Sequence, residues 1–298
     1  MKCKNCNRRE FLKTCAIGAG TAGLLQVGMP GDIFAAKPPN LKINVTARCL
    51  FAGVVITAEN QKTLPNPYRK KGDYALVMNR DCSGVNKGLD AVLSGAADIG
   101  TLYRPLTDEE KAGGLVETEL DRLAYSVVVN KKNPVDELTT EQVLKIFAGE
   151  IQNWKTVGGR DAEILIYRQK CGANYDWIMD QAIADAGIPK NHDRLKKAMM
   201  SVEITDNQFE KIAALDMAVT MAPRSFFDAK SKTLKVSGVS PTRNSEKDGS
   251  YPFCCPLSLV SRQDASETVK NYLSFMSGSN GRKLIEKGLN MNWLKDGF

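Results

Sequence analysis

Short apolar runs alternate with amphipathic helical patterns along this chain, and that alternation is what most restricts its fold. Such runs are typical of buried strands, and helices between them favour a mostly parallel sheet. Strands are expected at residues 41–46, 74–78, 97–100, 123–130, 164–168, 217–221 and 257–261. Helices are expected at residues 85–94, 140–148, 175–186 and 266–277. The pattern therefore predicts an α/β protein.

The helix expected near residue 140 has the clearest local signals. Thr139 and Gln142 have the spacing of a capping box, which satisfies two backbone N–H groups at a helix start. An apolar face follows, made by Val143, Leu144 and Phe147. Gly149 then supplies a left-handed C-terminal stop. The sequence alone thus predicts both ends of this helix.

Residues 138–159 also carry a longer motif. They resemble the LT-x-EQ-x-x-x-IF-x-G-x-I-x-NW-x-x-VGG signature of phosphate-type periplasmic binding proteins. Five further segments resemble landmarks of that family in the same order: residues 83–100, 104–110, 127–135, 238–242 and 249–252. The resemblance therefore covers nearly the whole chain after its N-terminal segment.

The resemblance implies a two-lobed type II periplasmic binding protein fold, in which two crossover strands join the lobes and the ligand lies in the cleft. About 262 residues follow the N-terminal segment, more than one typical domain, which agrees with two lobes. Lobe one is expected at residues 41–123 plus 252–298, and lobe two at residues 124–251.

The N-terminal 36 residues resemble an export signal. Arg8 and Arg9 stand in a twin-arginine-type motif, and the apolar run at residues 15–27 is too short and too weakly apolar for a membrane span. Residues 33–36 resemble a cleavage region. We expect export to a periplasm or another extracytoplasmic space; the alternative is a disordered basic tail.

Charge and motif content exclude several classes of function. The net charge of +7 would fall to +4 without the five Lys/Arg and two acidic residues of the first 36 positions, a modest excess that suits an anionic ligand. No block rich in Lys and Arg indicates nucleic-acid binding. The single histidine, His192, stands in a polar helix start where we expect it to be exposed. Because no catalytic arrangement or cofactor motif is evident, we predict a protein that is not an enzyme, with no cofactor and no resident metal.

The candidate ligand residues lie in three loops that hold phosphate in the family. Their hydroxyl groups are largely replaced here, while arginine and glycine remain. The candidates are Arg48 and Cys49 in the first loop, Cys82, Ser83 and Gly84 in the second, Arg168, Cys171, Gly172 and Asn174 in the third, and Arg104 after the third strand. Arginine offers a two-pronged fork to an oxyanion, and a helix N-terminus offers backbone N–H groups.

One cysteine falls in each of those loops, namely Cys49, Cys82 and Cys171. Thiolates favour soft metals and metalloids, so the three could form a soft-ion site. The alternatives are a disulfide or inert buried packing. For the adjacent Cys254 and Cys255, two ordinary thiols are favoured over a strained vicinal disulfide.

These observations favour an exported, monomeric solute-binding protein that captures a small phosphate-like anion for the permease of an ABC importer. Two alternatives within the binding class are a soft metal or metalloid receptor and a sensory binding module. From another class, a Cys-dependent redox protein would require an accessible, low-pKa thiolate at Cys171.

Overall fold

The computed structural model describes residues 40–45, 75–80, 85–169, 174–193, 195, 199–202, 214–223 and 230–289. The chain divides into two compact units, residues 1–37 and 38–298, and every described residue lies in the second. The predicted signal at residues 1–36 therefore lies outside the described part and stays a prediction. Among the described helices, none combines the length and the apolar character needed to cross a membrane.

One half of the second unit is built on parallel strands. Strands β1 (Asn40–Val45), β2 (Ala75–Arg80) and β3 (Ile99–Leu102) pair in parallel, in the order β2-β1-β3. Strand β11 (Cys254–Arg262) adds to β3 in the antiparallel sense and pairs on its other side with the first part of β4 (Leu115–Asn130). We call these strands the first half-sheet.

The second half-sheet begins on the same long strand. From Tyr125 onward β4 pairs antiparallel with β8 (Ala218–Pro223), and β8 is followed by the parallel strands β6 (Leu165–Gln169) and β7 (Met199–Val202). Strand β9 (Ser231–Thr233) pairs with the end of β4. A separate two-stranded sheet joins β5 (Glu137–Leu138) and β10 (Lys235–Val236).

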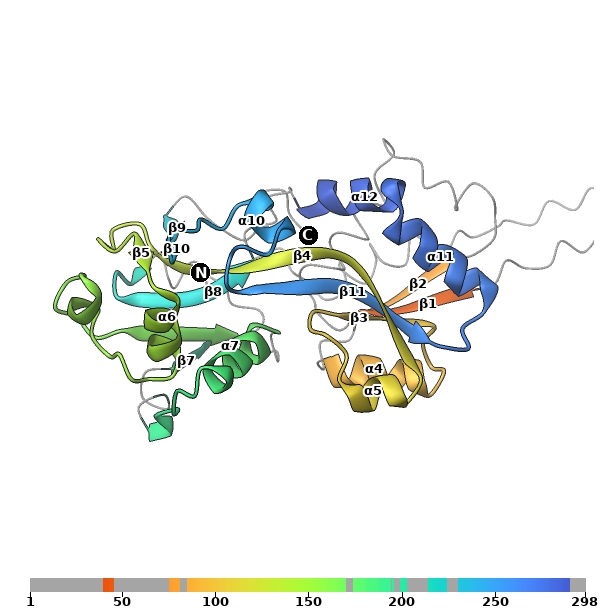
Figure 1. Cartoon of the computed structure of the whole chain (residues 1–298), viewed down its shortest axis with the longest axis horizontal. Helices are drawn as coiled ribbons and strands as arrows, with labels where there is room; N and C mark the ends of the chain where they lie inside the picture. The colour runs from red at the N-terminus through yellow and green to blue at the C-terminus, as the bar shows by residue number, and fades with distance from the viewer. Residues whose placement is uncertain are drawn as a thin grey trace, which may run out of the picture. The chain divides into compact units, whose positions relative to one another are not determined.

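Strand β4 is the element that the two half-sheets share. Its residues from Leu115 to Ala124 pair with β11, and the next residue, Tyr125, pairs with Pro223 of β8. Figure 1 shows β4 and β11 lying side by side through the middle of the fold. The residues of β4 from Leu123 to Asn130 are all buried, because this part of the strand is covered on both faces.

The helices connect and cover these strands. They are α4 (Val85–Leu93), α5 (Asp108–Ala112), α6 (Thr140–Phe147), α7 (Asn174–Asp185), α10 (Arg243–Lys247), α11 (Glu267–Ser277) and α12 (Ser279–Leu289), with a 3₁₀ turn at Trp154–Val157. The buried side chains of α11 are Val269, Tyr272, Leu273 and Met276, one face at helical spacing.

Helix α6 confirms the capping prediction in detail. The Thr139 side chain accepts from Gln142 N, and the Gln142 side chain accepts from Thr139 N at 2.8 Å. At the other end Gly149 has a φ of +80°, and Glu150 N donates to Lys145 O at 2.8 Å. Together with the bond from Gly149 N to the carbonyl of residue 146, this closes a Schellman motif.

The α/β class and the main strands are confirmed, whereas the expectation of a mostly parallel sheet is wrong in the middle. There β3, β11, β4 and β8 are antiparallel neighbours. The sequence pattern also misses the first part of β4, since Glu117, Glu119 and Asp121 interrupt any apolar run there. An antiparallel sheet can have one face in contact with water, so a strand in it needs no continuous apolar stretch.

The close contact between α11 and α12 depends on Gly281. A Cβ built on this residue would lie 2.4 Å from Met276 Cα, and that neighbour is backbone that cannot rotate away. We expect Gly281→Ala to lower the free energy of unfolding by about 1–3 kcal/mol, because the two helices must separate. Urea unfolding measures this, with the neighbouring exposed Asn280→Ala as control, which should change stability by less than about 0.5 kcal/mol. Equal stability of the two variants would contradict the close packing.

Candidate functional site

The carboxyl ends of three parallel strands lie at one edge of the first half-sheet. Val45, the last residue of β1, pairs with Arg80, the last residue of β2. Strand β3 runs in the same direction, and its last residue Leu102 pairs with Ser258, which in turn pairs with Glu119 of β4. Ligands in open α/β sheets bind beyond such ends.

The second half-sheet presents its carboxyl ends to the same stretch of β4. Strands β6 and β8 run in parallel, and β8 ends where Ala222 pairs with Ser126 and Pro223 with Tyr125. Beyond the end of β3, and in the direction in which β3 runs, the pairing of β11 with β4 continues from Glu119 to Ala124. The two edges therefore face each other across the middle of β4, near residues 119–126. This is the candidate binding region.

Most of the predicted ligand residues belong to segments outside the described residues. They are Arg48, Cys49, Cys82, Ser83, Gly84, Cys171 and Gly172. Their roles and the thiol site remain predictions. The elements on either side are placed, since β1 ends at Val45, β2 ends at Arg80 and α4 begins at Val85.

Arg168 and Asn174 are placed by their backbone alone. Arg168 is the penultimate residue of β6 and pairs with Ser201 of β7, at the carboxyl end of the strand. Asn174 is the first residue of α7, the helix that follows the third predicted loop. Both lie at the edge where the sequence places the third loop. Their contact with a ligand stays a prediction.

Arg104 has a partner that the sequence analysis did not assign to it. Its two terminal nitrogens donate to the two oxygens of Glu110 at 2.7 and 2.6 Å, and Nη1 also donates to Pro105 O. The hydrogen bond from Arg104 holds the pKa of Glu110 below its usual value and raises the pKa of the guanidinium. The guanidinium nitrogens that were predicted to bind an anionic ligand thus bind the Glu110 carboxylate instead.

The position of Arg104 has a local cause. Glu110 closes the capping box of α5 with Thr107, which fixes the carboxylate beside the arginine. Leu106 N donates to Glu117 Oε2 at 3.2 Å, so the chain after β3 turns back toward the start of β4. The T-x-x-E spacing of residues 107–110 was a readable signal for the capping box that positions Glu110, but it did not indicate Arg104 as the partner of this carboxylate. A ligand role for Arg104 stays a prediction, and it would require Glu110 to share the guanidinium.

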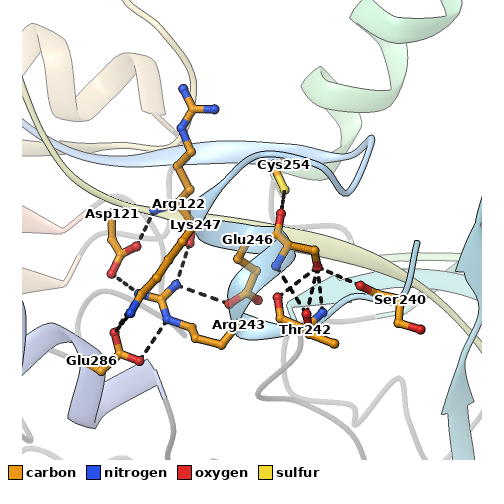
Figure 2. Close-up of polar contacts among 10 residues, drawn as sticks. Asp121, Arg122, Ser240, Thr242, Arg243, Glu246, Lys247, Cys254 and Glu286 are labelled. Atoms are coloured by element: carbon orange, nitrogen blue, oxygen red, sulfur yellow. Dashed lines mark hydrogen bonds and ion pairs between the residues drawn. The ribbon is translucent and has the colours of Figure 1, made fainter. Parts of the chain in front are cut away.

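A partly buried charge cluster lies beside the candidate region and is centred on Arg243 of α10 (Figure 2). Nε and Nη2 donate to the two oxygens of Glu286 at 3.1 and 3.0 Å, and Nη2 also donates to Asp121. Nη1 donates to Glu246 at 3.3 Å and to the backbone carbonyl of Arg122 at 3.2 Å. All five N–H donors are used, and only 13% of the side chain is exposed.

The cluster is structural rather than anion-binding. Its three carboxylates belong to Asp121, Glu246 and Glu286, and its two cations are Arg243 and Lys247. Lys247 pairs with Glu286 at 2.8 Å. An added anion would meet a net negative environment. Sequence reasoning missed Arg243, since its partners at positions 121 and 286 are distant along the chain and no local pattern links them.

The described cysteines are ordinary thiols, as the sequence analysis favoured. Cys254 and Cys255 are free, and Cys254 Sγ lies 3.7 Å from Ser245 O, to which it donates. Burial raises the pKa of Cys254 to about 11 and that of Cys255 well above its usual value. Neither is a ready nucleophile at neutral pH.

Three other features of the described residues bear on function: a histidine, possible metal ligands and a hollow. His192 is exposed, as expected. Across the described residues no cluster of three or more His, Cys, Asp or Glu side chains is arranged to hold a metal ion. A hollow of about 160 Å³ beside Trp154 is lined by Arg160 and Asp216, which pair with each other at 3.3 Å; it lies away from the middle of β4.

Known proteins resemble the chain over most of its length. A family model described as PBP superfamily domain matches residues 62–280. The phosphate-binding protein PstS of Borreliella burgdorferi is 25% identical over 215 residues, covering 70% of this chain and 76% of that protein. PstS of Bacillus subtilis is 26% identical over 209 residues, covering 68% and 66%.

Solved structures agree on the fold. A putative phosphate ABC transporter substrate-binding protein with bound phosphate from Clostridium perfringens superposes with a TM-score of 0.68 at 24% identity, covering 84% of this chain and 97% of that one. A phosphate transport receptor from Vibrio cholerae gives 0.66 at 21% identity, covering 83% and 97%. The architecture is therefore the two-lobed type II fold that the sequence predicted.

Ser126 supplies a first test of the middle of β4. Its hydroxyl is buried and has no hydrogen-bond partner within the described part of the chain. Because an unpaired buried hydroxyl costs free energy, we expect Ser126→Ala to raise the free energy of unfolding by about 1 kcal/mol. The control is Ser245→Ala, which removes the 2.7 Å bond to Ser240 O together with the capping bond from Thr242 N, and it should lower the free energy of unfolding by about 1–2 kcal/mol. A loss of stability in Ser126→Ala would show that this hydroxyl has a partner.

Glu286 supplies a second test, through pH. The hydrogen bond from Arg243 lowers its pKa from 4.5 to about 2, so its contribution to stability is complete above pH 4.5 and is lost as pH falls through about 2. We expect Glu286→Gln to cost about 1–2 kcal/mol at neutral pH, a value reduced for the partial exposure of the carboxylate. Urea unfolding of wild type and variant should give curves that converge as pH approaches 2. A gap that does not depend on pH would contradict the ion pair.

Proposed function

Because the chain belongs to the PBP superfamily, whose domain model matches residues 62–280, we propose that it is a solute-binding protein that captures phosphate or a closely related oxyanion. It hands this ligand to the permease of an ABC importer and catalyses no reaction. The observation that carries the proposal is the convergence of both carboxyl edges on the middle of β4, joined to the likeness to phosphate-binding proteins.

The chemistry of the edges supports an anion. Helices α4 and α7 begin within a few residues of the ends of β2 and β6, so their N-terminal backbone N–H groups are available at the edges. Arg168 stands at the end of β6 and supplies a positive charge with forked geometry. In this proposal Ser83 and Gly84 of the second loop, with Gly172 and Asn174 of the third, complete the site.

The proposal includes export and a two-lobed arrangement. The twin-arginine-type segment at residues 1–36 would direct the protein to the periplasm or another extracytoplasmic space, where it acts as a monomer. The lobes are proposed at residues 41–123 plus 252–298 and at residues 124–251. Pairing of β11 with β3 and with the first part of β4 supports the return of the chain to lobe one.

The second candidate function is that of a receptor for a soft metal or metalloid, which could act in import or as a sensory binding module. The observation that favours it is the single cysteine in each of the three loops, Cys49, Cys82 and Cys171. A thermal-shift panel of oxyanions and thiophilic ions separates the two candidates, because a ligand that binds only the folded state raises the melting temperature. The redox alternative is not retained, since the reported relatives are named as binding proteins.

Arg168 provides the quantitative test. We expect the chain from residue 37 onward to bind inorganic phosphate in isothermal titration calorimetry, and Arg168→Ala to bind it about ten-fold or more weakly, since a charge-assisted hydrogen bond contributes about 1.5–3 kcal/mol. Arg160→Ala is the matched control, because this arginine is exposed and pairs with Asp216. Full affinity in Arg168→Ala would remove this residue from the site, and no binding by wild type would refute phosphate as ligand.

A further inference from the structure

We infer that the second hinge between the lobes lies at Val239 and Ser240, and that Arg243 holds α10 to the first half-sheet as one rigid block. The proposed boundary between residues 251 and 252 would then move to about residue 239. The inference rests on the proposed function only in that two-lobed binding proteins close around a ligand.

The chain before Val239 is fastened to the second half. Strand β10 pairs with β5, which leads into α6. Ser237 Oγ accepts from Thr140 N at 2.9 Å, and Gly238 N donates to Glu137 Oε1 at 2.8 Å. Val239 itself exchanges both backbone bonds with Val236, at 2.9 and 3.0 Å. Up to Val239 the chain therefore moves with α6.

The chain from Ser240 onward is fastened to α10. Ser240 O accepts from Thr242 N at 2.9 Å and from Ser245 Oγ at 2.7 Å. Thr242 and Ser245 form the capping box of this short helix. The carbonyl of Ser245 then accepts from Tyr251 N, which binds the following turn to the same unit.

Arg243 fastens this unit to the first half-sheet. Its guanidinium reaches Asp121 and the carbonyl of Arg122 in the part of β4 that pairs with β11, and Glu286 in α12 (Figure 2). Lys247 repeats the contact with Glu286 one turn later. Arg243, Ser245 and Lys247 thus connect α10 to β4, β11 and α12. The link between the two fastened segments is the peptide between Val239 and Ser240.

The first crossing of the chain between the two halves lies on β4, and its contacts agree with a pivot at residues 239–240. On β4 the partner changes between Ala124 and Tyr125, and two bonds cross there, from Tyr125 N to Phe253 O at 2.9 Å and from Val127 N to Tyr251 Oη at 3.2 Å. Bonds close to a pivot are displaced least when the lobes move. Hinges are a few residues at element ends that absorb the change in φ and ψ, and residues 239–240 meet that description.

The contacts by which Arg243 holds α10 to β4 and α12, here called the clamp, have a consequence for binding. The apparent affinity of a two-state receptor falls with the fraction of molecules in the binding-competent state. Releasing α10 from β4 and α12 adds open or misaligned conformations without changing any group in the ligand loops. Arg243 is therefore a positioning residue, which acts through the alignment of the lobes.

Distance measurements between genetically encoded spin labels test the inference in the ligand-free protein. Labels go on three exposed positions, Asn244 in α10, Ser274 in α11 and Ala184 in α7. We expect Arg243→Gln to broaden the 244–274 distance distribution, whereas Arg122→Gln, which breaks only the exposed pair with Glu119, should leave it unchanged. An unchanged 244–274 distribution in Arg243→Gln overturns the inference.

Two further measurements keep the test decisive. If Arg243→Gln does not fold, Glu286→Gln removes one arm of the clamp and should broaden the 244–274 distribution to a smaller extent; no broadening there overturns the inference. Saturating phosphate should shift the 244–184 distance and leave the 244–274 distance in place, and the reverse result moves the hinge back to residues 251–252. Failure of wild type to bind phosphate in calorimetry refutes the proposed ligand, while the ligand-free result on Arg243 stands.

Discussion

The change of partner along β4 is the constraint on which the rest of the structure depends. One continuous strand pairs with β11 up to Ala124 and with β8 from Tyr125. Because β3 and β8 approach that point from opposite directions, their carboxyl ends, and those of the strands parallel to them, face the same stretch of chain. The convergence of these ends follows from hydrogen-bond register alone, before any side chain is considered, and it is there that the proposed ligand would bind.

Charge pairing then decides which arginines are available to a ligand. Arg104 and Arg243 each present a guanidinium fork, and in both cases carboxylates of the chain occupy it. A largely buried guanidinium has to be matched by acceptors, since removing an unpaired charge from water is costly. By its backbone, Arg168 stands at the carboxyl end of a parallel strand, just before the third predicted loop, and it is the arginine on which the proposed function depends.

The proposed receptor needs a rigid block on each side of a small pivot, and the described contacts supply both. Glu137 and Thr140 hold the chain before Val239, whereas Asp121 and Glu286 hold the chain after Ser240 through Arg243. Clamping α10 in this way leaves the lobes free to move while fixing the axis about which they move. Binding strength would then depend on residues far from the ligand as well as on those in the loops.

The sequence by itself determined the α/β class, most strand positions, both ends of α6 and the family, because these depend on local patterns: apolar runs, a capping box at Thr139 and a glycine at position 149. Capping and turn formation involve neighbours within a few residues, so they can be read from the chain directly. Only the tertiary structure decided that Arg104 pairs with Glu110 and that Arg243 joins Asp121 to Glu286. The partners of Arg243 lie 122 and 43 residues away along the chain, and no local pattern encodes a contact that exists only once the half-sheets have formed on β4.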